Sequence, residues 1–96
     1  MTETPAIYKQ TAGKPRVSLV PPALVEEVAK VRTWAVATKY TDPEGWRNVP
    51  PQDYADAIGR HFFAYLRDHD SVDAESGLSH LAHIATNCAF LLEMTR

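Results

Sequence analysis

Hydrophobic and polar residues repeat with a helical period between Asp73 and Glu93, near the end of the chain. A helix advances by about 100° per residue, so residues at this spacing share one face. The apolar row comprises Leu78, Leu81, Ala85, Cys88 and Leu92. A second, polar row comprises Ser76, His80, His83 and Asn87. A solvent-exposed row would carry lysine and glutamate, so these neutral hydrogen-bonding groups indicate a partly buried face.

Two earlier segments show the same period. The first runs from about Pro22 to Tyr40, and its apolar residues form two adjacent rows. These rows are Leu24, Val28, Val31 and Ala35, and beside them Val25, Ala29 and Val36. The second segment runs from about Pro51 to Asp68. Its core-facing residues are expected to be Tyr54, Ile58, Phe62, Tyr65 and Leu66. Prolines and a glycine interrupt the pattern in residues 41–53, which are expected to form a loop.

The pattern predicts an all-α domain of three helices with short connecting loops. Residues 1–15 are polar and lack any period, which indicates a flexible N-terminal arm. Residues 16–96 then form a single helical domain. The two apolar rows of the first helix cover about half of its circumference, which is more than one neighbouring helix buries. We therefore expect dimerisation, or a higher homo-oligomer, to complete the core.

Composition narrows the possible partners. The 96 residues carry a net charge of −2 with neutral histidines, so no basic surface for a nucleic-acid polymer is expected. The single cysteine excludes an internal disulfide and favours a reducing, cytoplasmic compartment. No apolar stretch is long enough to cross a membrane, and the N-terminus lacks the hydrophobic core of a signal peptide.

Carboxylates and histidines cluster around the start of the third predicted helix. His80 and His83 are spaced i, i+3 and share a face, and Asp73 and Glu75 shortly precede them. With Asp56 from the second helix, these groups suit Mg²⁺ or Mn²⁺, and imidazole ligands shift the preference towards Mn²⁺ or zinc. The alternative is a packed helix whose histidines are satisfied by hydrogen bonds.

Cationic and aromatic residues supply a second set of candidates. Lys39, Arg47 and Arg60 can neutralise a polyphosphate, and Trp46 in the predicted loop can contact a base. Alternatively, Trp46 caps the core and Arg60 forms a surface ion pair with Asp56. The chain contains no Walker A loop, no dinucleotide-binding glycine motif and no CxxC pair.

Several ordered motifs resemble a family of phage proteins. They are KPRVSLVPPALVEEVAKV, KY, GWRNV, YADAIGRHFFAYL and DAESGLSHLAHIATNCAFLL, which together span roughly residues 13–93. The family is the N-terminal domain of dATP/dGTP diphosphohydrolases, which is similar to the all-α nucleotide pyrophosphohydrolases of the MazG type. The resemblance therefore implies a helical bundle that oligomerises and holds Mg²⁺ or Mn²⁺ with clustered acids.

The resemblance also implies a set of site residues. It favours Arg60, His61, Glu75, His80, His83 and Asn87, with Lys39, Trp46 and Arg47 as substrate contacts. The sequence departs from MazG-type enzymes in one motif. Those enzymes carry an EExxE motif, which is incomplete in this chain. Glu26 and Glu27 are followed by Lys30, and no ExxD motif occurs in the third predicted helix. Either the metal ligands are arranged differently, or this domain does not bind metal as those enzymes do.

Together, the residues and the resemblance predict metal-dependent hydrolysis of a deoxynucleoside triphosphate, such as dATP or dGTP, to the monophosphate and pyrophosphate. The predicted catalytic residues are Glu75, Asp56 and His61. The predicted metal ligands are Asp73, Glu75, His80 and His83. The predicted substrate-binding residues are Lys39, Trp46, Arg47, Arg60 and Asn87. The alternative is a non-catalytic helical module that binds a nucleotide or a partner protein.

Overall fold

Three α-helices form the body of the protein. The computed structural model describes residues 12–96, which form α1 (Pro22–Thr38), α2 (Pro51–Arg67) and α3 (His80–Met94). Two short 3₁₀ helices, η1 (Val17–Leu19) and η2 (Gly45–Asn48), precede α1 and α2. The described residues contain no strand, and their one isolated bridge joins Val72 to Ser79. The predicted all-α architecture of three helices is confirmed. Most of the predicted arm, residues 1–11, lies outside the described residues.

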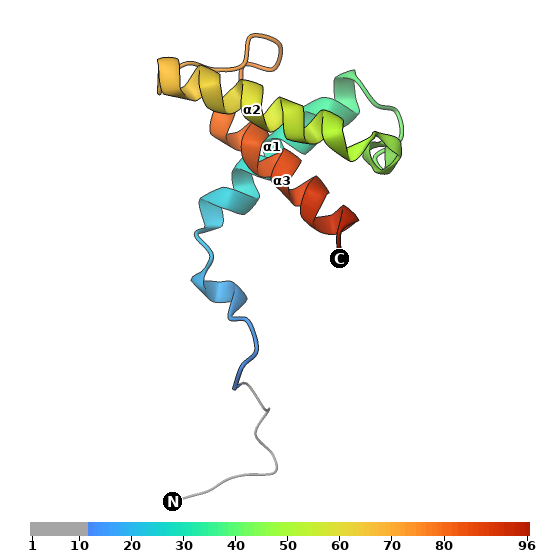
Figure 1. Ribbon diagram of the computed structural model, residues 1–96, viewed down its shortest axis with the longest axis vertical. Coiled ribbons are helices and arrows are strands. Elements are labelled where there is room, and N and C mark those ends of the chain that lie inside the picture. Colours follow the sequence, from blue (N-terminus) through green and yellow to red (C-terminus); the bar gives the residue numbers. More distant parts are fainter. Residues whose placement is uncertain (1–11) are drawn as a thin grey trace, which may run out of the picture.

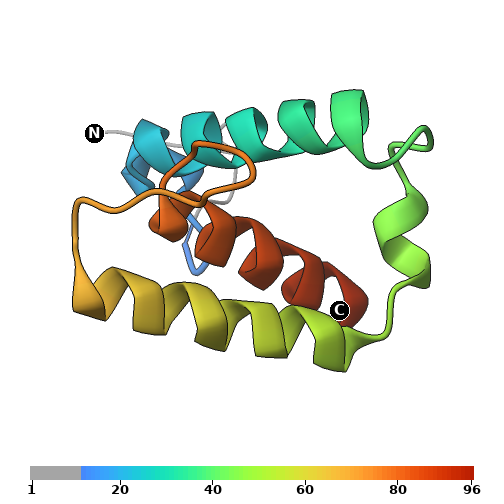
Figure 2. The same cartoon turned by 90° about the horizontal axis from the view of Figure 1, so that it is seen from above.

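The helices are arranged around α3. Both α1 and α2 pack against α3, whereas no Cα atom of α1 lies within 8 Å of a Cα atom of α2. Figure 2 shows α1 and α2 on opposite sides of α3, and in Figure 1 the segment that contains η1 extends away from the three helices. This arrangement leaves a space between α1 and α2, and α3 forms its floor.

Proline defines where the first two helices begin. Pro22 and Pro51 each occupy the first turn, where the missing N–H has no intrahelical partner and the fixed φ suits the helix. Each follows another proline, which is extended. The predicted bounds of α1 and α2 are therefore confirmed to within two residues.

The predicted start of the third helix at Asp73 is wrong, because α3 begins at His80. Ser79 is the N-cap, and its Oγ accepts the Leu81 N–H at 3.1 Å. Residues 68–79 form a loop that crosses from α2 towards α1 and returns to α3 (Figure 2). Within it, side-chain oxygens accept backbone N–H groups, and Gly77 has φ +72°, which a helix excludes.

The buried core is small and partly polar. Its apolar members are Val31, Ala35, Trp46, Tyr54 and Ala82, and its polar members are His80, His83 and Thr86. The polar row of α3 thus faces inward, as its composition predicts. The apolar row of α3 faces outward at two positions, where Leu81 and Leu92 are 48% and 66% exposed.

Two residues predicted to face the core of α2 do not. Phe62 and Leu66 are 47% and 53% exposed, because the side of α2 that meets α3 carries Tyr54 and His61 instead. No helix in residues 12–96 is both long and apolar enough to span a membrane.

Candidate functional site

A cleft of about 540 Å³ opens between α1 and α2 above α3. Histidines and acids line one part of it, and aromatic side chains line the other. The predicted site residues that line the cleft are Lys39, Trp46, Arg60, His61, Asp73, Glu75, His80, His83 and Asn87. Most of the predicted site residues therefore share one concave surface, which is where small-molecule sites usually lie.

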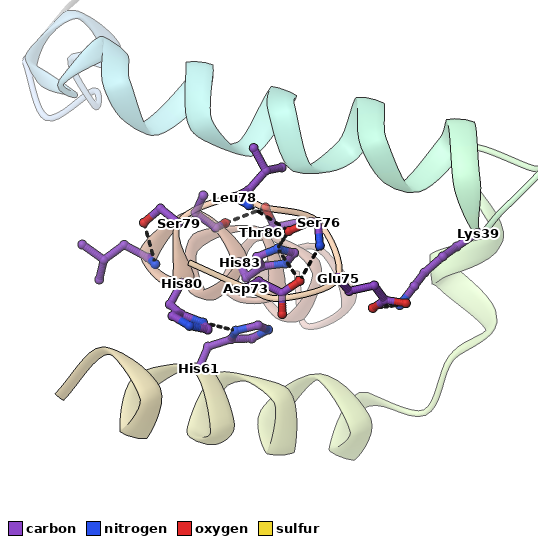
Figure 3. A network of polar contacts seen from close by, with 12 residues as sticks. Lys39, His61, Asp73, Glu75, Ser76, Leu78, Ser79, His80, His83 and Thr86 are labelled. Carbon is purple, nitrogen blue, oxygen red and sulfur yellow. Dashed lines mark hydrogen bonds and ion pairs between the residues drawn. The ribbon is translucent and has the colours of Figure 1, made fainter. Parts of the chain in front are cut away.

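Three histidine rings meet at the base of the cleft (Figure 3). His61 extends from α2, and its Nδ1 lies 2.8 Å from Nδ1 of His80, at the start of α3. The His61 ring also stacks on His83, with a centroid distance of 4.6 Å and an interplanar angle of 8°. A hydrogen bond between two Nδ1 atoms requires that one of them donates and the other accepts.

Asp73 is held next to these rings by Ser76. The Ser76 N–H donates to Asp73 Oδ2 at 2.9 Å, and Ser76 Oγ lies 2.7 Å from His83 Nε2. Asp73 Oδ2 is itself 3.7 Å from His83 Nε2. The acid and the serine thus meet the same imidazole nitrogen, whereas a catalytic triad places them at opposite nitrogens. This group therefore positions Asp73 and does not form a serine nucleophile.

The surroundings set the charges of the cluster. Burial, and then the neighbouring His83, lower the pKa of His61 below 6.5, and burial likewise lowers the pKa of His83. Burial alone would raise the pKa of Asp73, but the hydrogen bonds from Ser76 and the nearby histidines outweigh it, so this pKa is lowered. At neutral pH the site therefore combines the Asp73 carboxylate with the uncharged imidazoles of His61 and His83. Carboxylate and neutral imidazole are the protonation states that metal ligands need.

Three side chains are placed to share one ion. Ligand atoms of His61, Asp73 and His80 all lie within 4.8 Å of one another. Among the predicted ligands, Asp73 and His80 belong to this group. His83 instead meets Ser76 through Nε2, and Glu75 meets Lys39. His61, which the sequence suggested as a catalytic group, completes the set.

An ion pair crosses the mouth of the cleft. Lys39 Nζ, at the end of α1, lies 2.8 Å from Glu75 Oε1 in the loop 68–79 (Figure 3). Lys39 also lies over the Trp34 ring, 5.3 Å from its centroid. Both charged side chains are at least 40% exposed. A polyphosphate that enters the cleft would therefore meet Lys39 at its edge.

Trp46 packs as part of the core. Its ring stacks on Phe90 at 4.6 Å, and the Arg47 guanidinium lies over it at 4.3 Å. These two groups cannot occupy the same face, so both faces of the indole are covered. The Tyr54 hydroxyl donates to the Trp46 carbonyl at 2.8 Å, and burial raises the pKa of Tyr54 to about 12. Only the remaining edge of Trp46 is available to a ligand.

Two predicted site residues lie outside the lining of the cleft. Arg47 pairs with Glu44 at 2.7 Å, and exposed Asp56 accepts a hydrogen bond from Gln52 at 3.0 Å. Conversely, sequence reasoning missed Arg32, which lines the cleft, donates to the Pro43 carbonyl and lies over the Phe90 ring. No local pattern distinguishes Arg32, because its partners are 11 or more residues away.

Comparisons with known proteins identify the family to which the sequence is similar. Residues 5–96 match the family described as dATP/dGTP diphosphohydrolase, N-terminal. The dATP/dGTP diphosphohydrolase of Salmonella phage PMBT28 is 33% identical over 79 residues, which are 82% of this chain and 26% of that protein. This chain thus spans about a quarter of the length of that relative. No solved structure matches the chain significantly. With a match over nearly its whole length, the chain belongs to the family of dATP/dGTP diphosphohydrolase N-terminal domains.

Proposed function

We propose that this domain binds purine deoxynucleoside triphosphates in the cleft and hydrolyses them to the monophosphate and pyrophosphate. One observation carries the proposal: a single cleft combines the His61, Asp73 and His80 cluster with the cations Lys39 and Arg60. Hydrolysis of a phosphoanhydride needs a metal and a cationic environment for the phosphates, and this cleft offers groups for both. The name of the family supports dATP and dGTP as substrates.

The cations would bind the triphosphate. Lys39 and Arg60 line the cleft, and both side chains are exposed at its surface. Arg60 lies on α2 beside His61, so a phosphate held by its guanidinium would lie close to the histidine cluster. Lys39 would exchange its partner Glu75 for a phosphate oxygen, which would free the Glu75 carboxylate.

Glu75 is the proposed proton acceptor. The oxygen of water forms a bond to the α-phosphorus, the bond to the bridging α–β oxygen breaks, and pyrophosphate leaves. The Glu75 carboxylate takes the proton from the attacking water. A divalent ion, Mg²⁺ or Mn²⁺, would stabilise the charge that develops on the phosphate oxygens. Neutral His61, ionised Asp73 and His80 offer potential ligands for a divalent ion, because their ligand atoms lie within 4.8 Å of one another.

A non-catalytic nucleotide-binding module is the second candidate. The length of the phage relative favours this candidate. The match covers 26% of that protein, and the rest of such a protein could carry the catalytic residues. The scarcity of acids also favours it, since Asp73 is the one carboxylate in the three-residue ion group.

Incubation of the pure chain with dATP, dGTP or dCTP and Mn²⁺ or Mg²⁺ tests the proposal. We expect pyrophosphate and the monophosphate from the purine nucleotides, and none without a divalent ion. Arg60→Gln should raise KM for dATP, whereas the matched variant Arg67→Gln, at the end of the same helix and outside the cleft, should not. Nucleotide binding by calorimetry without pyrophosphate would favour the non-catalytic module. Absence of both binding and hydrolysis would contradict both functions.

A further inference from the structure

The strongest unassigned feature is the ligand chemistry of the three-residue ion group. His61 comes from α2, Asp73 from the loop 68–79 and His80 from the start of α3. It is the one group of three or more potential ligands with such spacing among residues 12–96. Because three separate elements meet there, an ion would join α2, the loop and α3.

The distance between the two imidazoles suits a shared ion. The two Nδ1 atoms lie 2.8 Å apart. Two ligand atoms at about 2.0–2.1 Å from one ion are about 2.9 Å apart at a right angle and about 3.3 Å apart in a tetrahedron. An ion could therefore replace the shared proton if the rings move by a few tenths of an ångström. That proton would move to the Nε2 atom of its own ring, so both Nδ1 lone pairs would face the ion.

The Asp73 carboxylate is held next to the imidazoles by hydrogen bonds within the loop. Asp73 Oδ2 accepts the Ser76 N–H, and Ser76 Oγ contacts His83 Nε2. Metal ligands are commonly oriented by such outer hydrogen bonds. His83 and Ser76 are therefore positioning residues for Asp73, and Ser76 is a member of the site that has no direct role at the ion.

The ligand types distinguish between metals. Mg²⁺ prefers an octahedral shell of oxygen atoms, and this group offers a carboxylate together with two nitrogen atoms. Imidazole nitrogen suits ions later in the first transition series, and two histidines with one carboxylate leave open positions for water and phosphate. We propose that His61, Asp73 and His80 bind a transition-metal dication, such as Mn²⁺, Co²⁺ or Zn²⁺, in strong preference to Mg²⁺.

The proposed ion site lies in the same cleft as the proposed hydrolysis. Only the role of the ion in catalysis, and not its binding, rests on that proposed function. A dication with one carboxylate retains one positive charge in excess, and this charge would attract the triphosphate. The ligand set differs from the clustered acids that the resemblance implied, because only one of its three members is an acid.

Metal binding without nucleotide tests the proposal directly. The metal-free full chain is titrated with the chlorides of Mn²⁺, Co²⁺, Zn²⁺ and Mg²⁺ in a calorimeter. We expect the Kd for Co²⁺ and Zn²⁺ to be at least about a hundredfold below that for Mg²⁺, with Mn²⁺ between them. A change in the visible absorption of Co²⁺ on addition of the protein would report that the ion has left its purely aqueous coordination. A Kd for Mg²⁺ equal to that for Mn²⁺ would overturn the proposal.

Matched variants test the ligands. His61→Phe keeps a ring to stack on His83 but removes a ligand nitrogen. Asp73→Asn keeps an oxygen for the Ser76 N–H but removes the negative charge of the carboxylate ligand. Both should weaken Co²⁺ binding by at least about tenfold. The controls His69→Phe and Asp70→Asn change the same residue types at exposed positions outside the cleft and should leave the Kd unchanged. Unchanged Co²⁺ affinity in a folded His61→Phe protein would overturn the proposal.

The unaltered protein provides a measurement that does not depend on variant folding. Substoichiometric Mn²⁺ should broaden the NMR signals of the His61 and His80 rings before that of His69, and equal broadening would contradict the site. The two proposals fail separately. Co²⁺ binding at these residues without dATP hydrolysis would remove the proposed hydrolysis alone. Full hydrolysis with Mg²⁺ and no ion on the histidines would remove the transition-metal site alone.

Discussion

At the scale of single residues, Glu75 is the most informative side chain to change. It pairs with Lys39 at 2.8 Å and its side chain is 62% exposed, so this ion pair adds little to stability. Glu75→Gln retains the shape of the side chain but cannot accept a proton as a carboxylate. We expect kcat for dATP to fall by about a hundredfold or more, with KM unchanged or lower because Lys39 is released. The melting temperature without metal should stay nearly the same.

Glu44→Gln is the matched control for Glu75→Gln. The Glu44 side chain is also 62% exposed and also pairs with a cation, Arg47, at 2.7 Å, but it lies outside the cleft. Its replacement should leave kcat unchanged. Parental kcat in Glu75→Gln, or equal losses in both variants, would argue against Glu75 as the proton acceptor.

The buried histidines predict how stability depends on pH. Burial lowers the pKa values of His61 and His83 in the folded protein. Below about pH 6.5 the unfolded chain therefore binds more protons than the folded chain, so the free energy of unfolding decreases as the pH falls. It should be nearly constant above about pH 7.5 as far as these groups are concerned. The pKa of Asp73 is lowered in the folded protein, so the folded state loses further stability when this carboxylate is protonated at more acidic pH.

Urea unfolding of the metal-free protein between pH 5 and 8 measures this dependence. His61→Phe should reduce the slope because it removes one of the titrating groups. His69→Phe, at an exposed position, should retain it. A free energy of unfolding that rises on acidification would contradict the assigned protonation states.

At the scale of elements, the loop 68–79 depends on one glycine. Gly77 has φ +72°, and a Cβ atom there would meet no atom within 4 Å, so only the backbone opposes a side chain. Gly77→Ala should lower the free energy of unfolding by about 1 kcal/mol or somewhat more. Gly59, within α2, also has open space around its Cβ position. Gly59→Ala should instead raise it by about 0.5–1 kcal/mol.

Thermal or urea unfolding of these two variants, which carry the same substitution, tests whether the loop holds its positive φ. Gly77→Ala should also weaken ion binding, because Asp73 and Ser76 lie in the same loop. Equal stability changes of the same sign in both variants would contradict the described loop conformation.

The accuracy of the sequence prediction differs between the elements, because some of them are defined by local interactions and others are not. The beginnings of α1 and α2 follow from Pro22 and Pro51, whose effect on the backbone is local. The start of α3 was mispredicted, since the side chains of Asp73 and Ser76 compete with helical hydrogen bonds in a way that periodicity does not detect.

The candidate site shows the same limit. The shared face of His80 and His83 follows from helical spacing, but their contacts with His61 depend on how α2 packs against α3. The pairing of Glu75 with Lys39 likewise requires the path of the loop, which no sequence pattern specifies.

At the scale of the whole molecule, apolar surface remains exposed on α2 and α3. Large side chains that are 47–66% exposed are Phe62, Phe63, Leu66, Leu81 and Leu92. Apolar surface of this kind on a small domain is typical of an interface. We expect a dimer or larger homo-oligomer at micromolar concentration, measured by light scattering.

Replacement of an exposed apolar side chain by a charged one tests this expectation. Leu92→Lys, at a position that is 66% exposed, should shift the protein towards the monomer. The control Ala37→Lys, at an exposed position on the polar side of α1, should not. A monodisperse monomer of the unaltered chain at such concentrations would contradict the predicted assembly.

The separation of α1 from α2, whose Cα atoms stay more than 8 Å apart, has a consequence for how the cleft binds its ligands. The ion group lies entirely on α2, the loop 68–79 and α3, whereas α1 contributes Lys39 and Trp34 to the opposite wall. A bound ion would therefore join α2, the loop and α3 without any ligand from α1. Hydrogen exchange should slow in the loop when the ion binds, and in α1 only when nucleotide follows. Substrate affinity could then change through residues that anchor α1 on α3, without any change at the ion.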